Sequence, residues 1–466
     1  MTQSLYQLSA IELVQKLKSG QVTIHDCLDS VHQRINQTDA VINALPTLCF
    51  DRAKAQADKI QALPVEQRGL LAGLPVTIKD LTPVANVRTT FGSRTYENHI
   101  PQQSDQLVQR LEQQGAVIYA KSNTPEFGTG GITFNDVFGI TRTPRNIQYA
   151  SGGSSGGAAA SLAAGSAWLS HGSDMAGSLR TPAAFCGVCS LRPSPGKIVA
   201  DSDFLPFDVL GEEGPMARNI QDLSLFADAM MSNRVESMLD AARSPLKPAK
   251  IAISNDLGIT TISDDVLNGF AQLVDNLVSN NIAIETEAPD LSGVHDVFDV
   301  LRAQSYAVSM EQILFDNPSV MKPEVEWNIQ SGLSLSAEKI RNAIRNQGQI
   351  INRAFNFMHD YDLLVCPATS VLSVEAELRY PGSDDVPIPE YYRWLAIAYA
   401  TTVTCLPIIT LPCGLGANGM PVGVQLIGKP GGEARLFRHA AAIEAMISWS
   451  SLPIDPIDTN SPATLI

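Results

Sequence analysis

Three serines with glycine neighbours form the pattern in this sequence that is best suited to chemistry. Ser154 and Ser155 lie inside the run GGSSGG at residues 152–157, and Ser178 follows a glycine later in the same stretch, residues 151–180. Glycine beside serine permits positive φ and a close approach of the backbone, so main-chain N–H groups and the hydroxyl can face one small space. The stretch therefore predicts a serine nucleophile with backbone donors nearby.

The elements that flank these serines are expected to hold them in place. An isolated Gly/Ser hexamer is more typical of a flexible linker. Residues 158–167, however, read AAASLAAGSA, which is small and helix-forming, and they follow the glycines directly. A helix that begins there would direct its first N–H groups into the loop. The apolar residues 168–170 then predict a short strand before the second loop.

Lys79 is a candidate base on a separate element. Residues 74–79 read LPVTIK, an apolar and β-branched run that predicts a buried strand ending on the lysine. A charged lysine at such a position is costly unless it is paired or neutral. Taken alone, Lys79 could equally extend its amine to the surface.

Two other motifs compete with this interpretation. Ser154 also fits the G-x-S-x-G nucleophile elbow, which needs a hydrophobic strand directly before it and a later Asp and His. Residues 145–150 make a poor strand, and the nearest histidine, His171, is more typical of a structural hydrogen bonder. The residues alone leave an elbow with a histidine base open. The G-x-G-x-x-G match at 414–419 precedes an expected strand, so it predicts a hairpin turn rather than a dinucleotide site.

Composition and charge narrow the class of protein. The chain has 44% hydrophobic and 17% charged residues and a formal net charge of −15, which argues against nucleic acid as a partner. No signal peptide or membrane-spanning apolar run is visible, so we expect a cytoplasmic protein without a membrane partner. The seven cysteines are expected to be thiols, with Cys186 and Cys189 buried and structural. No metal-ligand spacing is found.

Strands that alternate with helices predict an α/β fold with a mixed, mostly parallel central β-sheet, covered by helices on both faces. We expect a single domain over residues 1–466. It would comprise a helical segment at 1–65, a core at 70–225, and the remaining core with the substrate-pocket helices at 226–466. In the last part, strands are expected at 250–253, 282–285, 362–366, 408–411 and 422–427, and helices at 264–279, 295–315, 336–360, 391–402 and 433–447.

The motifs resemble, in order and spacing, the amidase signature family. They are LPVTIKD at 74–80, NTPEFG at 123–128, GGSSGG at 152–157, DMAGSLRTPAAFCGV at 174–188, GPMARNIQDL at 214–223 and PVGVQLIG at 421–428. This family includes fatty acid amide hydrolase, peptide amidase, malonamidase and the A subunit of tRNA-dependent amidotransferases. The resemblance implies a triad in which Ser178 is the nucleophile, Ser154 a serine with a cis peptide bond, and Lys79 the base.

The resemblance also implies the groups around the triad. The oxyanion hole would consist of the N–H groups of Met175, Ala176 and Gly177 and that of the nucleophile itself. Ala176 stands where the family usually has glycine, and would be strained if the position required positive φ. Asp174 and Arg180 flank the nucleophile and are expected to pair. Ser155 is expected to support the loop by hydrogen bonding.

The function implied is hydrolysis of a carboxylic acid amide through an acyl-enzyme on Ser178, releasing ammonia or an amine. No metal or organic cofactor would be needed, and the partner would be a small-molecule amide. The alternatives are an A-type subunit of a glutamine amidotransferase and a catalytically silent protein of the same fold. Phe127, Phe134 and Phe138 lie in an expected cleft loop and suggest an apolar or aromatic acyl group, although aromatic residues in such a loop equally often pack in the core. The N-terminal helices could pair two subunits as a homodimer.

Overall fold

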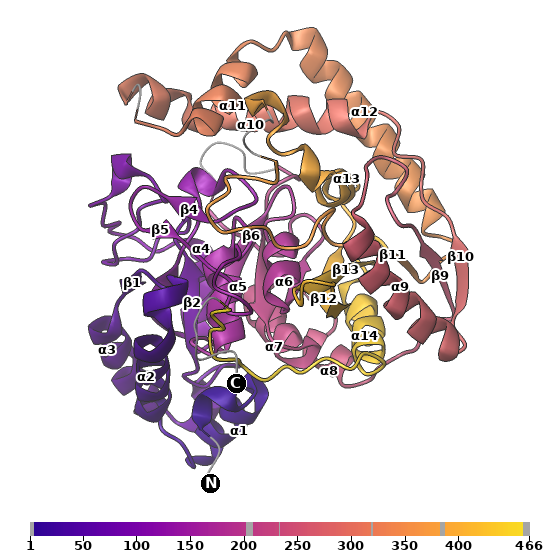
Figure 1. Cartoon of the computed structure of the whole chain (residues 1–466). Helices are drawn as coiled ribbons and strands as arrows, with labels where there is room; N and C mark the ends of the chain where they lie inside the picture. The colour runs from indigo at the N-terminus through magenta and orange to yellow at the C-terminus, as the bar shows by residue number, and fades with distance from the viewer. Residues whose placement is uncertain (1–3, 202–207, 233, 318–319, 383–386, 460–466) are drawn as a thin grey trace.

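The fold is built on one eleven-stranded sheet. The computed structural model describes residues 4–201, 208–232, 234–317, 320–382 and 387–459 of the chain. The strand order is β1-β3-β2-β6-β8-β7-β12-β13-β11-β9-β10 (Figure 1). The strands are β1 (Thr47–Leu48), β2 (Pro75–Lys79), β3 (Val117–Ser122), β6 (Leu169–Asp174), β7 (Cys189–Arg192), β8 (Glu212–Ala217), β9 (Lys250–Ile253), β10 (Ala283–Thr286), β11 (Leu363–Pro367), β12 (Ile408–Leu415) and β13 (Pro421–Ile427). A separate pair, β4 (Phe134–Asn135) and β5 (Gly139–Ile140), forms a two-stranded sheet.

The sheet is mixed, as expected. β2 is parallel to both of its neighbours, β3 and β6, and β9 is parallel to β11 and β10. The strands between these two groups pair antiparallel, including the hairpin of β12 and β13 that the glycine-rich turn at 414–419 predicted. Parallel neighbours need a crossover connection, and helices supply it between β2 and β3 and between β9 and β10.

Helices flank this sheet, and the structure is a single α/β domain. The helices are α1 (Ala10–Ser19), α2 (Ile24–Ile42), α3 (Phe50–Gln61), α4 (Gln106–Gln113), α5 (Gly156–Ala164), α6 (Arg180–Cys186), α7 (Ile220–Met230), α8 (Met238–Ala242), α9 (Asp264–Ser279), α10 (Val294–Asp316), α11 (Pro323–Leu333), α12 (Ala337–Phe357), α13 (Ala396–Val403) and α14 (Glu433–Glu444). Helices α10, α11 and α12 lie together at one end of the molecule (Figure 1). The division of the domain at 65–70 and at 225 stays a prediction.

The two elements that carry the glycine-flanked serines differ in detail from the sequence prediction. Helix α5 begins at Gly156, inside the glycine run, and every residue in it is buried. Its small side chains let it pack closely against β2, β3 and β6. Strand β6 continues past the expected end at 170 as far as Asp174, because it pairs along its whole length with β8. The second serine loop therefore starts directly at the edge of the sheet.

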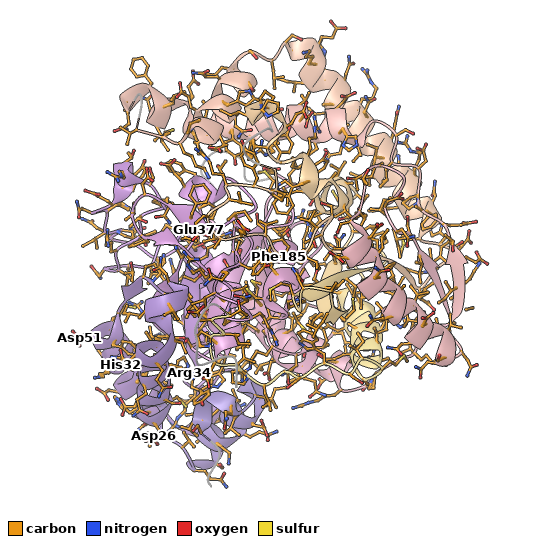
Figure 2. The ribbon with its side chains drawn as sticks, in the orientation of Figure 1. Asp26, His32, Arg34, Asp51, Phe185 and Glu377 are labelled. Carbon is orange, nitrogen blue, oxygen red and sulfur yellow. The ribbon has the colours of Figure 1, made fainter. Side chains whose placement is uncertain are left out.

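The N-terminal helices follow the capping signals. Ser9 and Thr23 accept hydrogen bonds from the N–H groups three residues later, and both helices begin with complete capping boxes. Arg34 of α2 then joins distant segments, since it donates to the carbonyl oxygens of Ala164 (2.6 Å) and Ile454 (2.8 Å) (Figure 2). The N-terminal layer is thus attached to the end of α5.

Two general expectations can also be compared with the fold. All seven cysteines are free thiols, and Cys186 and Cys189 are buried. Within the described residues, no helix combines the length and the apolar character that crossing a bilayer requires.

A substitution at Gly157 tests whether α5 must pack directly against the backbone of Asn123 and Ala44. A Cβ there would lie 2.2 Å from the Asn123 nitrogen and 2.5 Å from the Ala44 carbonyl oxygen. We expect Gly157→Ala to lower the free energy of unfolding by about 1–3 kcal/mol, because backbone rather than a flexible side chain must move. Gly348→Ala is the matched control, since Gly348 is an exposed helical glycine with open space around it, and it should raise stability by up to about 1 kcal/mol. Denaturant unfolding measures the free energy of unfolding of both variants. Equal changes in this free energy for the two variants would contradict the prediction.

Candidate active site

The structure brings Lys79 and the first serine pair together at the end of β2. The Lys79 Nζ atom lies 2.8 Å from Ser154 Oγ, 2.9 Å from Ser155 Oγ and 3.0 Å from Ser173 Oγ. The lysine is completely buried, because its strand lies between two parallel neighbours and α5 packs against it. Of the two interpretations of the sequence, the buried lysine is correct, and the surface one is wrong.

The environment of the amine favours its neutral form. Burial lowers the pKa of Lys79 to about 7, while the negative charges of Glu213 and Asp174 act in the opposite direction. No carboxylate of the described residues forms a salt bridge with Nζ, and the hydrogen-bond partners are hydroxyl and carbonyl groups. Near neutral pH, a large fraction of Lys79 can therefore accept a proton.

The loop of Ser154 has the geometry that the resemblance implied. The peptide bond between Gly153 and Ser154 is cis. Ser155 links this loop to the rest of the site: its hydroxyl donates to the Ser173 carbonyl oxygen at 3.2 Å, and its N–H donates to the Ser178 carbonyl oxygen at 3.1 Å. Ser155 thus has the supporting hydrogen bonds that were expected.

The first N–H groups of α5 do not have the role that the sequence suggested. The Gly156 N–H donates to Thr133 Oγ1, and the Gly157 N–H donates to the Asn123 carbonyl oxygen, both at 3.2 Å. They therefore anchor the helix to neighbouring loops. A ligand in the site would have to rely on donors from the second serine loop.

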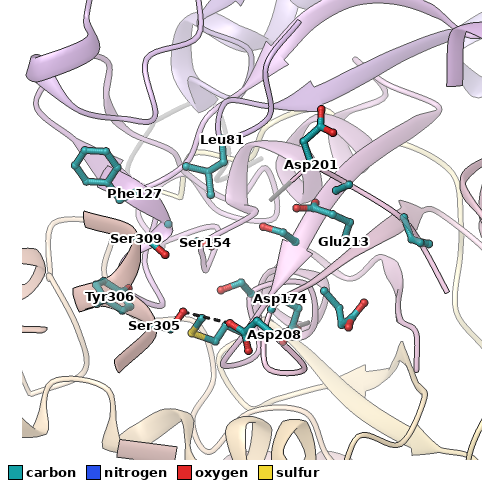
Figure 3. Close-up of a pocket in the computed structure, with 18 of the residues that line it drawn as sticks. Leu81, Phe127, Ser154, Asp174, Asp201, Asp208, Glu213, Ser305, Tyr306 and Ser309 are labelled. Carbon is teal, nitrogen blue, oxygen red and sulfur yellow. Dashed lines mark hydrogen bonds between the residues drawn. The ribbon is translucent and has the colours of Figure 1, made fainter. Parts of the chain in front are cut away.

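Ser178 and Ser154 line the same cavity, which has a volume of about 430 Å³ (Figure 3). Ser178 is half-buried, and among the described residues no side-chain partner accepts from or donates to its hydroxyl. Met175 also lines the cavity, next to Ser178 in the same loop. The candidate nucleophile and the candidate relay serine thus face a common space that is large enough for a small organic molecule.

The donors of the predicted oxyanion hole need one correction. The Gly177 N–H donates to Asp174 Oδ1 at 2.9 Å, so it is already used inside the protein. The donors left from the predicted set are the N–H groups of Met175, Ala176 and Ser178. Strain at Ala176 does not arise, because the positive φ in this loop falls on Gly177, at 107°.

Asp174 and Arg180 pair, as expected, and both are fully buried. Arg180 donates to the two carboxylate oxygens at 2.8 and 3.0 Å. Burial alone would raise the pKa of Asp174, but Arg180 and Arg192, with the Leu179 N–H, hold it well below its ordinary value. The second edge of the guanidinium donates to Thr401, Thr402, Gln425 and the Ala398 carbonyl oxygen. The loop of the candidate nucleophile Ser178 is therefore fixed by a satisfied, ionised pair.

The nucleophile-elbow alternative lacks its structural parts. No strand lies directly before Ser154 in the described chain, and the short β5 ends at Ile140. His171 Nε2 lies 2.6 Å from a Glu213 carboxylate oxygen, so this histidine is a structural hydrogen bonder. The residue next to Ser154 that can act as a base is Lys79.

The three phenylalanines of the expected cleft loop separate in space. Phe127 lines the cavity. Phe134 instead lies beneath the Lys322 amine, and Phe138 beneath the Arg88 guanidinium, each ring within cation–π distance. Of the three, only Phe127 lines this cavity and can contact an acyl group there, whereas Phe134 and Phe138 pack against charged side chains that do not line it.

Several cavity residues were not predicted from the sequence. Ser173 holds the Lys79 amine, and its position directly before the Asp174 motif was the signal that could have revealed it. Tyr306 and Met310 also line the cavity, but they belong to α10, far along the chain. The sequence of this helix contains no local pattern that marks them as cavity residues. Among the described residues, no three His, Cys, Asp or Glu side chains gather as a metal site would require.

Comparison with known proteins agrees with this geometry. The Amidase family model matches residues 26–437. The A subunit of the glutamyl-tRNA(Gln) amidotransferase of Anaeromyxobacter dehalogenans (strain 2CP-C) is 32% identical, over 91% of this chain and 93% of that protein. The corresponding protein of Natranaerobius thermophilus is 28% identical, over 98% and 99% of the two chains.

Solved structures share the fold. A bacterial aryl acylamidase of the amidase signature family superposes with a TM-score of 0.87 at 23% identity, covering 95% of this chain and 97% of its own. A 6-aminohexanoate cyclic dimer hydrolase gives 0.85 at 21% identity, covering 96% and 98%. Given the family match over most of its length, this chain belongs to the amidase signature family and is a hydrolase of amide C–N bonds.

Proposed function

We propose that this protein hydrolyses the amide bond of a small carboxylic acid amide through an acyl-enzyme on Ser178, releasing ammonia or an amine. The observation that carries the proposal is the contact of a buried, desolvated Lys79 amine with Ser154 in the wall of the cavity that Ser178 lines. Small amides fit the cavity volume of about 430 Å³. A serine hydroxyl is a weak nucleophile until a base removes its proton.

The proton relay follows from the contacts of Nζ. A neutral amine has two N–H donors and one lone pair, so it can donate to Ser155 and Ser173 and still accept the proton of Ser154. Ser154 then takes the proton of Ser178, whose oxygen attacks the substrate carbonyl carbon. When the tetrahedral intermediate collapses, the C–N bond breaks and the proton returns through Ser154 to the leaving nitrogen.

The loop of Met175, Ala176 and Ser178 supplies N–H groups for the developing oxyanion. Each such donor contributes roughly 3–4 kcal/mol to transition-state stabilisation when it is preorganised. The pair of Asp174 and Arg180 holds this loop rigid from beneath. Water then attacks the acyl-enzyme with the same relay as base, and the carboxylate leaves.

A second candidate is an A-type subunit of a glutamine amidotransferase, because the curated relatives carry that name. In that case the same site would free ammonia from glutamine for a partner protein. Hydrolysis of simple amides by the purified chain alone favours the first candidate. A strict requirement for a partner favours the second. A cytoplasmic location and a homodimer built on the N-terminal helices are further proposals.

Covalent labelling tests the nucleophile and its base together. We expect a serine-reactive fluorophosphonate to label Ser178, and expect Ser178→Ala to abolish both the label and amide hydrolysis, by at least about a thousandfold in kcat. Lys79→Ala should slow both by about a hundredfold or more, since the general base is lost. Ser334→Ala is the matched control, because Ser334 is exposed at the end of α11. Label found on Ser154, or equal labelling of Ser178→Ala, would overturn the assignment.

The pH profile tests the neutral amine. Because only unprotonated Lys79 can accept a proton, kcat/KM should rise with pH through a midpoint near its pKa of about 7, and fall roughly tenfold per unit below it. Glu213 raises this pKa, so Glu213→Gln should move the acidic limb to lower pH. Asp275→Asn, an exposed position on α9, should leave the midpoint unchanged. A midpoint that stays constant in Glu213→Gln, or a rate that rises with falling pH, would contradict the role of Lys79.

A further inference from the structure

The active-site cavity has two walls of opposite character. Leu81, Phe127, Tyr306 and Met310 form an apolar wall, in which the last three belong to one hydrophobic cluster. The same cavity is also lined by four carboxyl groups, which we call the acidic wall: Asp201, Asp208, Glu212 and Glu213. In Figure 3, Phe127 and Tyr306 lie on one side of Ser154, Asp201 and Glu213 lie on the other, and Asp208 lies close to Ser305 of α10.

Two members of the acidic wall are held by neutral donors. Asp201 is exposed, and it accepts hydrogen bonds from the N–H and side-chain amide of Gln106, at 3.0 and 2.6 Å. Asp208 is half-buried, and it accepts from the Leu210 N–H at 2.9 Å and from Ser305 Oγ at 3.2 Å (Figure 3). These bonds orient the carboxylates without neutralising them.

The other two members lie deeper. The Oε2 atom of Glu213 lies 2.6 Å from His171 Nε2. Glu212 is only 7% exposed and lines the cavity, yet no described side chain donates to its carboxyl group or forms a salt bridge with it. Its neighbours are the Gly196 N–H and, at longer range, Arg192, and burial raises its pKa to about 8. Near neutral pH this buried carboxyl group is therefore mostly protonated, and a cation bound against it would favour its charged form.

No arginine or lysine side chain compensates this wall among the described residues that line the cavity. Lys197 lies in the sequence between the lining residues Gly196 and Ile198. Its amine, however, forms an ion pair with Glu433 at 3.8 Å, and Glu433 does not line the cavity. Arg192 donates to the backbone oxygens of Asp174 and Val209. Lys79 lies beneath Ser154 and bonds to hydroxyl groups. The carboxyl groups of Asp201, Asp208 and Glu213 therefore make the field negative in this part of the cavity, where it attracts cations and repels anions.

We propose that the substrates of this amidase carry a cationic ammonium or guanidinium group, which the acidic wall binds, together with a hydrocarbon portion that contacts the apolar wall. This inference rests on the proposed function, and it names the substrate class of the same site. Amides that carry a carboxylate in place of this cationic group would be repelled. The cation can belong to the acyl portion or to the leaving amine, and two series of amides separate these sources.

The test compares amides of equal length and different charge. In the acyl series, ammonia release is measured from 5-aminopentanamide, neutral pentanamide and anionic glutaramate. In the amine series, amine release is measured from N-(4-aminobutyl)acetamide and N-butylacetamide. We expect kcat/KM of the cationic member to exceed that of the neutral member about tenfold or more in at least one series, with glutaramate the slowest. The preference should shrink as salt rises from about 0.05 to 0.5 M, because salt screens partly exposed charges.

Variants locate the preference in the acidic wall. Asp208→Asn and Glu212→Gln should each lower the ratio of kcat/KM between the cationic and neutral members by about threefold to tenfold. The matched control is Asp275→Asn, which removes one negative charge from exposed α9 and should leave the ratio unchanged. If both wall variants keep the wild-type ratio, the wall does not bind the substrate and the proposal is overturned.

Failure of this inference can be distinguished from failure of the proposed function. If neutral amides are hydrolysed as fast as cationic ones in both series, and Ser178→Ala abolishes that activity, the amidase function stands and the cation preference is wrong. If wild-type protein hydrolyses none of the five amides and Ser178 is not labelled, both are wrong. Faster hydrolysis of glutaramate than of pentanamide would also overturn the inference.

Discussion

The rest of the site depends on the desolvation of a single amine. Lys79 is completely buried, and its Nζ atom contacts hydroxyl groups rather than a carboxylate. Removing an ammonium ion from water without a counter-ion is expensive, so the protein favours the neutral form, which lowers the pKa to about 7. A surface lysine would stay protonated near pH 7 and could not begin the proposed relay. The chemistry thus requires that β2 stay covered by its two neighbouring strands and by α5.

The same requirement explains why Asp174 is held by arginine. This carboxylate lies at the end of β6, the strand next to that of Lys79, and its charge raises the pKa of the amine. Arg180 binds both of its oxygens, and four further contacts fix the guanidinium. With its charge already paired, Asp174 can organise the nucleophile loop without becoming a counter-ion of Lys79. The ion pair contributes to geometry more than to net stability.

Sequence reasoning predicted what short segments determine. The capping boxes of α1 and α2, the hairpin of β12 and β13, and the three candidate catalytic side chains all have local signals of type and spacing. It failed where tertiary contacts decide. Pairing with β8 makes β6 longer than the sequence predicted. The loop that carries Phe134 places this ring under the Lys322 amine instead of in the cavity. The use of the Gly177 N–H by Asp174 also follows from a turn whose exact path no local pattern specifies.

The cavity also combines residues that local sequence motifs identify with residues that only the tertiary structure brings together. The side of the cavity with the candidate catalytic residues comes from β2 and the two serine loops, which carry motifs of the family. Tyr306 and Met310 of the apolar wall come from α10, and the acidic wall comes from residue 201 and residues 208–213. Membership of the family therefore explains the reaction but not the choice of amide. The two sides are nevertheless coupled through Glu213, which belongs to the acidic wall and raises the pKa of Lys79. A cationic substrate group placed against Glu213 would oppose that effect, so that binding of the proposed substrate would also favour the neutral amine that we propose as the base.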